Sequence, residues 1–75
     1  MVKFETIKAK EVSIGKNNFL EVARRKAISE KGENEFLSIS RGFVTDSGEK
    51  RYLKSFTIPL DENVIKFVSS ALLEV

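Results

Sequence analysis

The chain has 75 residues, of which 41% are hydrophobic and 32% charged, and its formal net charge is +2. A chain of this length forms one small domain, which buries only about 60% of the surface of its unfolded state. It contains neither cysteine nor histidine, which excludes disulfides, zinc sites of the usual type, thiol nucleophiles and histidine acid–base chemistry. We therefore expect no cofactor and no enzymatic activity, and we expect association with a second copy to stabilise the domain.

The positive charge is concentrated in the first 60 residues. They hold 12 Lys and Arg against 8 Asp and Glu, whereas residues 61–75 hold one Lys and three acidic residues. This asymmetry favours a nucleic-acid partner. No apolar run is long enough to span a bilayer, and the N-terminus lacks the apolar segment of a signal peptide. Together with the absence of cysteine, this predicts a cytoplasmic location and no membrane partner.

The first half of the chain predicts two strands and a loop. Residues 1–11 alternate loosely between apolar and polar side chains, and they fit either an extra strand or a mobile arm. The segment "FLEVARRK", residues 19–26, predicts a strand, and "SEKGENE", residues 29–35, predicts a turn or a loop, which we interpret as a mobile loop. In "FLSISRGFV", residues 36–44, the alternation predicts a half-buried strand, in which Gly42 indicates a bulge or a sharp bend.

A hairpin and further strand structure follow. The segment "TDSGE", residues 45–49, predicts a hairpin turn in which Gly48 adopts a positive φ. The next segment, "KRYLKSFTIPL" at residues 50–60, fits one long strand or two short strands broken near Ser55. Because Pro59 cannot donate a ladder hydrogen bond, we expect it at a sheet edge or at the end of a strand.

The last segment, "DENVIKFVSSALLEV", predicts an amphipathic helix with Asp61 as its N-cap. Its apolar residues span an arc of roughly 160°, wider than the ~100° stripe that covers one sheet. A single sheet cannot bury the whole arc, so we expect a second copy to cover the remainder in a twofold-symmetric dimer. The predicted dimer interface consists of Val64, Ile65, Phe67, Val68, Ala71, Leu72 and Val75.

Three segments resemble a known family when they are taken in order. They are "IGKNNFLEV" at residues 14–22, "LSISRGFVTDSGE" at residues 37–49 and "IPLDENVIKFV" at residues 58–68. Over residues 12–75 the chain resembles the single-stranded-DNA-binding domain of the transcriptional coactivator positive cofactor four family. The resemblance implies an α+β fold, in which a curved four-stranded antiparallel sheet precedes a C-terminal helix that pairs with its dimer mate. It also implies a groove for unpaired DNA.

The resemblance also implies roles for individual residues. Phe43 matches the position of a Trp that stacks on a base, and Lys16 matches the Lys of the family's opening motif. Arg25 and Lys26 stand where the family has an aromatic residue followed by a Lys, so the charge is kept and one stacking ring is missing.

Two further matches are displaced. Lys54 lies close to a basic pair that precedes the family's last strand, where this chain has Ser55 and Phe56. Arg41 neighbours the position of a family Arg, which is Ser40 in an ungapped match. A displacement of one residue reverses the face of a strand, unless Gly42 marks a bulge.

Binding a single strand without sequence preference requires a basic path for the phosphates and aromatic faces for the bases. The candidate nucleic-acid-binding residues are Lys16, Arg24, Arg25, Lys26, Lys31, Arg41, Phe43, Arg51, Tyr52 and Lys54. The alternative for the cations is an ordinary solvated strand face. For the rings it is the core, to which we assign Phe4, Phe36 and Phe56, while Phe43 and Tyr52 fit either role.

The sequence thus predicts a homodimeric, sequence-nonspecific single-stranded-DNA-binding protein that protects or stabilises unwound DNA. Members of the family in eukaryotes carry a long Ser-rich arm, so the short segment before residue 12 favours a prokaryotic or bacteriophage source. In that setting we expect a role in replication or recombination, in a prokaryotic cell or a phage-infected host. The alternative function is a transcription cofactor that acts mainly through protein–protein contacts. The sequence leaves the choice between DNA and RNA open.

Overall fold

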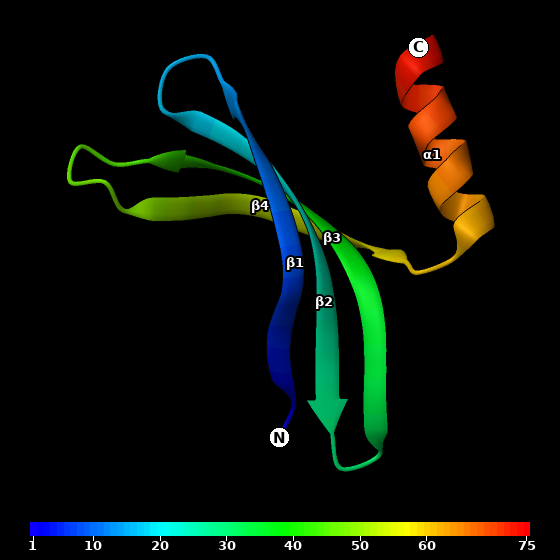
Figure 1. Cartoon of the computed structure of the whole chain (residues 1–75). Coiled ribbons are helices and arrows are strands. Elements are labelled where there is room, and N and C mark those ends of the chain that lie inside the picture. Colours follow the sequence, from blue (N-terminus) through cyan, green and yellow to red (C-terminus); the bar gives the residue numbers. More distant parts are fainter.

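The computed structural model describes residues 1–75 and has an α+β fold (Figure 1). Four strands form one antiparallel sheet in the order β1-β2-β3-β4, and a C-terminal helix follows, as predicted. The elements are β1 (Lys3–Ile14), β2 (Asn18–Ser29), β3 (Gly32–Val44), β4 (Lys50–Pro59) and α1 (Glu62–Glu74). The helix falls short of the length and apolarity that a membrane-spanning segment requires.

The N-terminal segment is a strand. Strand β1 pairs with β2 from Lys3, opposite Ile28, to Ile14, opposite Asn18. For residues 1–11 the sequence left a strand and a mobile arm open, and the structure has the strand. Because β1 continues through the expected boundary between residues 11 and 12, the sheet is not divided there.

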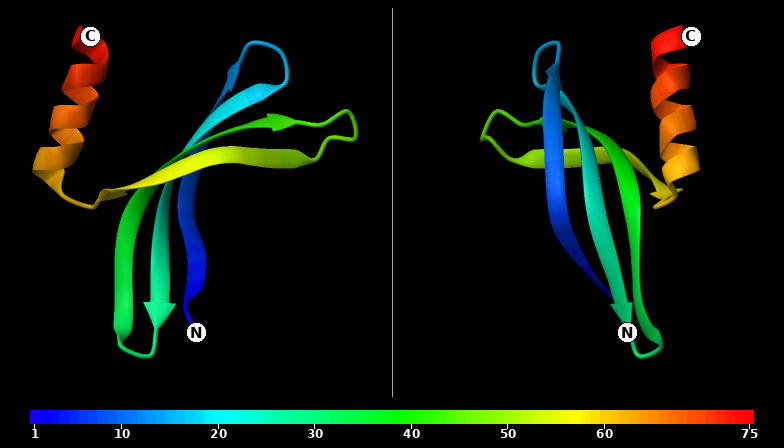
Figure 2. Two further views of the ribbon diagram at one scale, coloured as in Figure 1. Left: turned by 180° about the vertical axis from the view of Figure 1, so that it is seen from behind. Right: turned by 45° about the vertical axis from the view of Figure 1, so that its right-hand side comes forward.

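The sheet bends sharply between two arms (Figures 1 and 2). The hairpin of β2 and β3 forms one arm, and the turns that join β1 to β2 and β3 to β4 lie at the end of the other. We call the face inside the bend the inner face and the face toward α1 the outer face. Small residues occupy the inner face in the middle of the strands, where Ala23, Ser38, Ser40 and Gly42 are buried. Small side chains leave space for the two arms to approach each other.

A bulge in β4 sets the direction of the side chains that follow it. Arg41 pairs with Lys54 and Gly42 pairs with Tyr52, so Leu53 is an extra residue in β4. A bulge or a sharp bend was predicted at Gly42 in β3; the register does shift beside Gly42, but the extra residue lies on the partner strand β4. Because a one-residue shift reverses the face of a strand, Tyr52 lies on the inner face and Lys54 on the outer face.

The turns differ from expectation in one case. Gly48 has φ 86° and donates to the Thr45 carbonyl over 2.9 Å, which confirms the predicted hairpin turn. For residues 29–35 the predicted turn is present and the predicted mobile loop is wrong, since β2 and β3 remain paired as far as Ser29 and Gly32. The turn contains only two residues, so most of the polar segment "SEKGENE" is strand.

The helix begins at the predicted N-cap, but none of its own residues is fully buried. The Asp61 carboxylate accepts hydrogen bonds from the backbone N–H groups of Asn63 and Val64, over 2.8 and 3.4 Å. No residue of α1 is buried, and the side chain of Phe67 is 73% exposed. The helix stands apart from the outer face of the sheet (Figure 2), with an apolar gap of about 160 Å³ between Val22 and Ile39 on the sheet side and Val68 on the helix side.

The single chain has a very small core. Phe19 and Ala23 are its only fully buried hydrophobic residues. The prediction that Phe4 and Phe56 belong to the core is wrong for one chain, since they are 54% and 59% exposed. Phe36 is half-buried. Phe56 lies opposite Ile39 on the outer face, beside the gap under the helix.

Candidate nucleic-acid interface

Four of the predicted binding residues lie together on the outer face of β3 and β4. Arg41 is directly opposite Lys54, and Phe43 is directly opposite Arg51. We call these four residues the hairpin patch. Arg51 approaches Glu49 over 3.5 Å, whereas Arg41 and Lys54 form no ion pair. Like charges directly opposite each other in a sheet are destabilising, so an anion bound beside this exposed pair would be favourable.

Phe43 is half-buried and shares the outer face with Leu37 and Ile39. Strand β3 pairs with β2 without interruption here, so Gly42 does not change the direction of Phe43. The ring lies between Asn18 and Arg51 on the neighbouring strands. It is accessible on one side and beside a cation.

Two other predicted residues, Arg25 and Tyr52, lie on the inner face. The Tyr52 hydroxyl donates to Glu21 over 3.1 Å, and its ring meets the edge of Phe19 at a centroid distance of 5.3 Å. The Arg25 guanidinium lies 5.4 Å from the centre of the Phe4 ring. Arg25 forms no ion pair, and its buried Nε atom has no hydrogen-bond partner.

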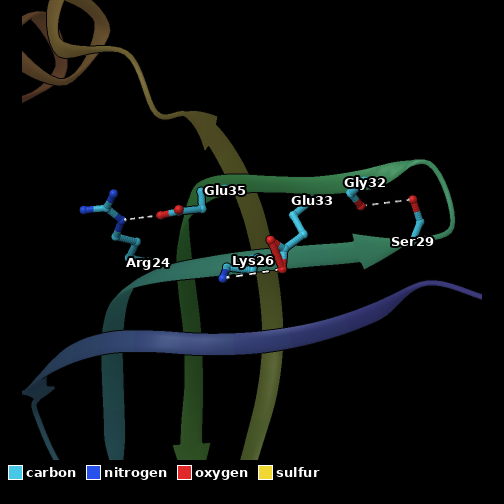
Figure 3. A network of polar contacts seen from close by, with 6 residues as sticks. All are labelled: Arg24, Lys26, Ser29, Gly32, Glu33 and Glu35. Atoms are coloured by element: carbon cyan, nitrogen blue, oxygen red, sulfur yellow. Dashed lines mark hydrogen bonds and ion pairs between the residues drawn. The ribbon is translucent and has the colours of Figure 1, made fainter.

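The remaining predicted cations are less suited to hold phosphate. On the outer face, Arg24 pairs with Glu35 over 2.9 Å and Lys26 approaches Glu33 over 3.7 Å (Figure 3). These carboxylates reduce the local positive potential. Lys16 and Lys31 are exposed in the β1–β2 and β2–β3 turns, at opposite ends of the sheet (Figure 1). Lys31 is held in a tight turn and not in the mobile loop expected of it.

Sequence reasoning missed several residues that share these surfaces. On the inner face, Phe4 meets Phe36 edge to face at 6.2 Å, while Lys50 pairs with Glu11 and lies over the Phe19 ring. Lys50 and Glu11 are 39 positions apart in the chain, and no local pattern signals their contact. On the outer face, Lys8 lies opposite Arg24.

Two ionisable groups of the inner face have shifted pKa values. The hydrogen bond to the Glu11 carboxylate is the main cause of the raised pKa of Lys50. Partial burial raises the pKa of Tyr52, and its hydrogen bond to Glu21 raises it further. Both shifts preserve the protonated forms. At neutral pH the inner face therefore keeps a charged Lys50 and a neutral, donating Tyr52.

Alkaline titration tests this environment directly. Tyr52 is the only tyrosine and tryptophan is absent, so the ultraviolet phenolate signal reports on Tyr52 alone. We expect the titration midpoint of Tyr52 above the ordinary tyrosine pKa of about 10. Glu21→Gln should lower this midpoint, while Glu33→Gln should leave it unchanged. The stabilising contribution of Tyr52 is complete below pH ~10 and is lost as the pH rises through the higher folded-state pKa. If Tyr52 of the unsubstituted protein titrated with a midpoint at or below ~10, this result would contradict its partial burial and its hydrogen bond to Glu21.

Comparison of the chain with protein-family models, with curated proteins and with solved structures finds no match. Its function must therefore be inferred from the site itself.

Proposed function

We propose that the protein is a homodimer that binds single-stranded DNA with little sequence preference and stabilises it in the unwound state during replication or recombination. The observation that carries the proposal is the uncompensated pair of Arg41 and Lys54 across β3 and β4. A polyanion along the β3–β4 hairpin would supply the missing negative charge. In this proposal the strand follows the edge formed by β4.

The hairpin patch combines the two kinds of contact that a single strand needs. Arg41, Arg51 and Lys54 supply three cations at neighbouring positions across β3 and β4, which suits successive phosphates. Phe43 lies beside them, and Tyr52, 52% exposed on the opposite face of the same edge strand, offers a second ring. Stacking of a base on an aromatic ring contributes about 1–3 kcal/mol and tolerates any base. The patch therefore favours binding without sequence preference.

A second copy of the chain supplies the core that one chain lacks. Val22 and Phe56 on the outer face of the sheet are exposed, and so are Phe67, Leu72 and Leu73 on α1. Apolar surface on this scale marks an interaction site, and a twofold-symmetric dimer is the commonest closed arrangement that covers such a surface. The hairpin patch extends beyond this apolar region toward the end of the arm, so dimerisation would leave it accessible.

Binding measurements at two salt concentrations test the proposal. We expect a labelled oligo-dT of about 20 nucleotides to bind more tightly than a duplex of the same length. We also expect the affinity for the single strand to fall as salt rises, because bound phosphates release counterions. Equal binding of both nucleic acids would overturn the proposal. Absent binding would also overturn it, and would favour a cofactor that acts through protein contacts.

Lys54→Gln identifies the surface in the same assay. Removal of one phosphate contact should reduce the slope of log affinity against log salt by roughly 0.7 per site. Lys66→Gln is the matched control, because Lys66 lies on α1 and pairs with Glu62 over 3.0 Å. An unchanged slope for Lys54→Gln would place the DNA elsewhere on the protein.

A further inference from the structure

The inner face contains a polar cavity of about 360 Å³ beside the edge strand β4. Its walls include Glu21, Arg25 and the Tyr52 side chain, and Ser38 and Ser40 lie at its floor, where both are buried. The volume falls within the range of small-molecule sites. Because the floor residues are small, a flat group can approach the sheet closely here.

The cavity contains two charged groups with unused hydrogen-bonding capacity. Arg25 lies against the Phe4 ring and makes no hydrogen bond or ion pair, so its terminal N–H groups remain available. Glu21 accepts one hydrogen bond, from the Tyr52 hydroxyl to Oε2, and its other oxygen has no partner. A carboxylate and a guanidinium each bind best through two parallel hydrogen bonds. A fitting ligand therefore presents two adjacent donors to Glu21 and two adjacent acceptors to Arg25.

Among the bases of DNA, guanine best meets both requirements. Its N1–H and N2–H groups are adjacent donors, and its O6 and N7 atoms are adjacent acceptors that match the fork of an arginine. We propose that the inner cavity is a guanine subsite, in which Glu21 accepts from N1–H and N2–H while Arg25 donates to O6 and N7. The exposed ring of Tyr52 then lies at the rim of the cavity, where the base enters.

This inference rests on the proposed single-strand binding and refines it. Tyr52 and Lys54 lie on opposite faces of the same edge strand, so a strand that follows β4 on the outer side is close to the cavity entrance. One base of a flexible single strand can turn over this edge, as unstacked bases do in single-strand recognition. The contacts between the phosphates and the hairpin patch do not depend on sequence, whereas the one base that enters the cavity is preferentially guanine.

Oligonucleotides that differ at one base test the subsite without altering the protein. A dT oligomer of about 20 nucleotides with a single central guanine is compared with all-dT, and with oligomers that carry hypoxanthine or 7-deazaguanine at the same place. Hypoxanthine lacks the N2 amino group and 7-deazaguanine lacks N7. We expect guanine to bind about tenfold more tightly than thymine, since one good bidentate pair discriminates by this order. Each analogue should lose most of that gain.

The fluorescence of the single tyrosine gives a local readout. Entry of guanine into the cavity should change the Tyr52 emission more than all-dT does at equal saturation. Glu21→Gln and Arg25→Gln should abolish the guanine preference, because each variant removes one of the two bidentate partners of the base. Glu33→Gln, on the outer face, should retain the preference. Free dGMP should bind more weakly than the guanine oligomer, because it lacks the neighbouring phosphates.

The possible failures have different meanings. Equal affinity for all-dT and the guanine oligomer would overturn the guanine subsite and leave single-strand binding intact. A preference that survives both cavity variants would place guanine recognition elsewhere, and dGMP binding as tight as that of the oligomer would replace a DNA subsite with a free-nucleotide site. Absence of binding to either oligomer would overturn single-strand binding itself, and the subsite with it.

Discussion

Gly42→Ala is expected to lower the melting temperature by about 10–20 °C at fixed protein concentration, because Gly42 is the one glycine of the chain at which an added Cβ meets close neighbours. The added Cβ would lie 2.3 Å from the Arg51 carbonyl oxygen and 2.7 Å from Cζ of Phe19. The first contact is with backbone and the second with the most buried ring of the protein, so neither can move away easily. We estimate a cost of roughly 3 kcal/mol in the free energy of unfolding.

The effect should extend to the binding surfaces. Gly42 pairs with Tyr52 at the bulge, and displacement of β4 would change the direction of Tyr52 and Lys54 together. Thermal unfolding by circular dichroism measures the stability, and the alkaline titration of Tyr52 reports the local change.

Gly15→Ala is the matched control for Gly42→Ala. Gly15 has φ 57°, and a Cβ added there would have no neighbouring atom within 4 Å. Alanine at this position should therefore cost only about 1 kcal/mol of backbone strain. If Gly42→Ala lowered the melting temperature no more than Gly15→Ala, the result would contradict the close approach of β4 to β3 at the bulge.

Phe67→Glu is expected to dissociate the proposed dimer. The side chain is 73% exposed in the single chain, so its replacement should disturb the isolated fold very little. Burial of a Phe side chain in an interface contributes about 1.5–3 kcal/mol, which corresponds to roughly tenfold to hundredfold in the dissociation constant. Burial of the introduced carboxylate in the interface would weaken the dimer further. Sedimentation over a dilution series, with circular dichroism to follow secondary structure, measures the change.

Ser47→Glu introduces the same charge in the exposed β3–β4 turn, away from α1, and should leave the dimer unchanged. Two results would contradict the proposed interface. The natural protein could sediment as a monomer at all concentrations, or Phe67→Glu could dimerise as tightly as the natural protein. The first result would also require another explanation for the exposed apolar residues of the outer face.

Local signals in the sequence were sufficient for the order of the elements and for several of their ends. Asp61 begins the helix because a carboxylate can accept from the free N–H groups of its first turn. Gly48 marks the hairpin because its turn needs a positive φ, and Pro59 ends an edge strand because it has no N–H to donate. Each of these features depends on a residue and its immediate neighbours, so the sequence alone could predict it.

The candidate site could be predicted only in part. Arg41, Arg51 and Lys54 were candidates because they are cations, and Phe43 was a candidate only through the family resemblance; the structure brings the four together because β3 and β4 form a hairpin. The separation of Tyr52 from Lys54 was not predictable. Residues two apart in a regular strand share a face, and only the extra residue Leu53 breaks that rule.

By itself, then, the sequence of this protein determined an antiparallel sheet, a capped amphipathic helix, and a surplus of cations and rings around the β3–β4 hairpin. Tertiary structure alone decided which face each ring occupies, that the N-terminal segment is a strand, and that Glu21, Arg25 and Tyr52 share one cavity. The physical reason is that strand register depends on pairing between distant segments. A shift of one residue in that pairing moves every following side chain to the opposite face.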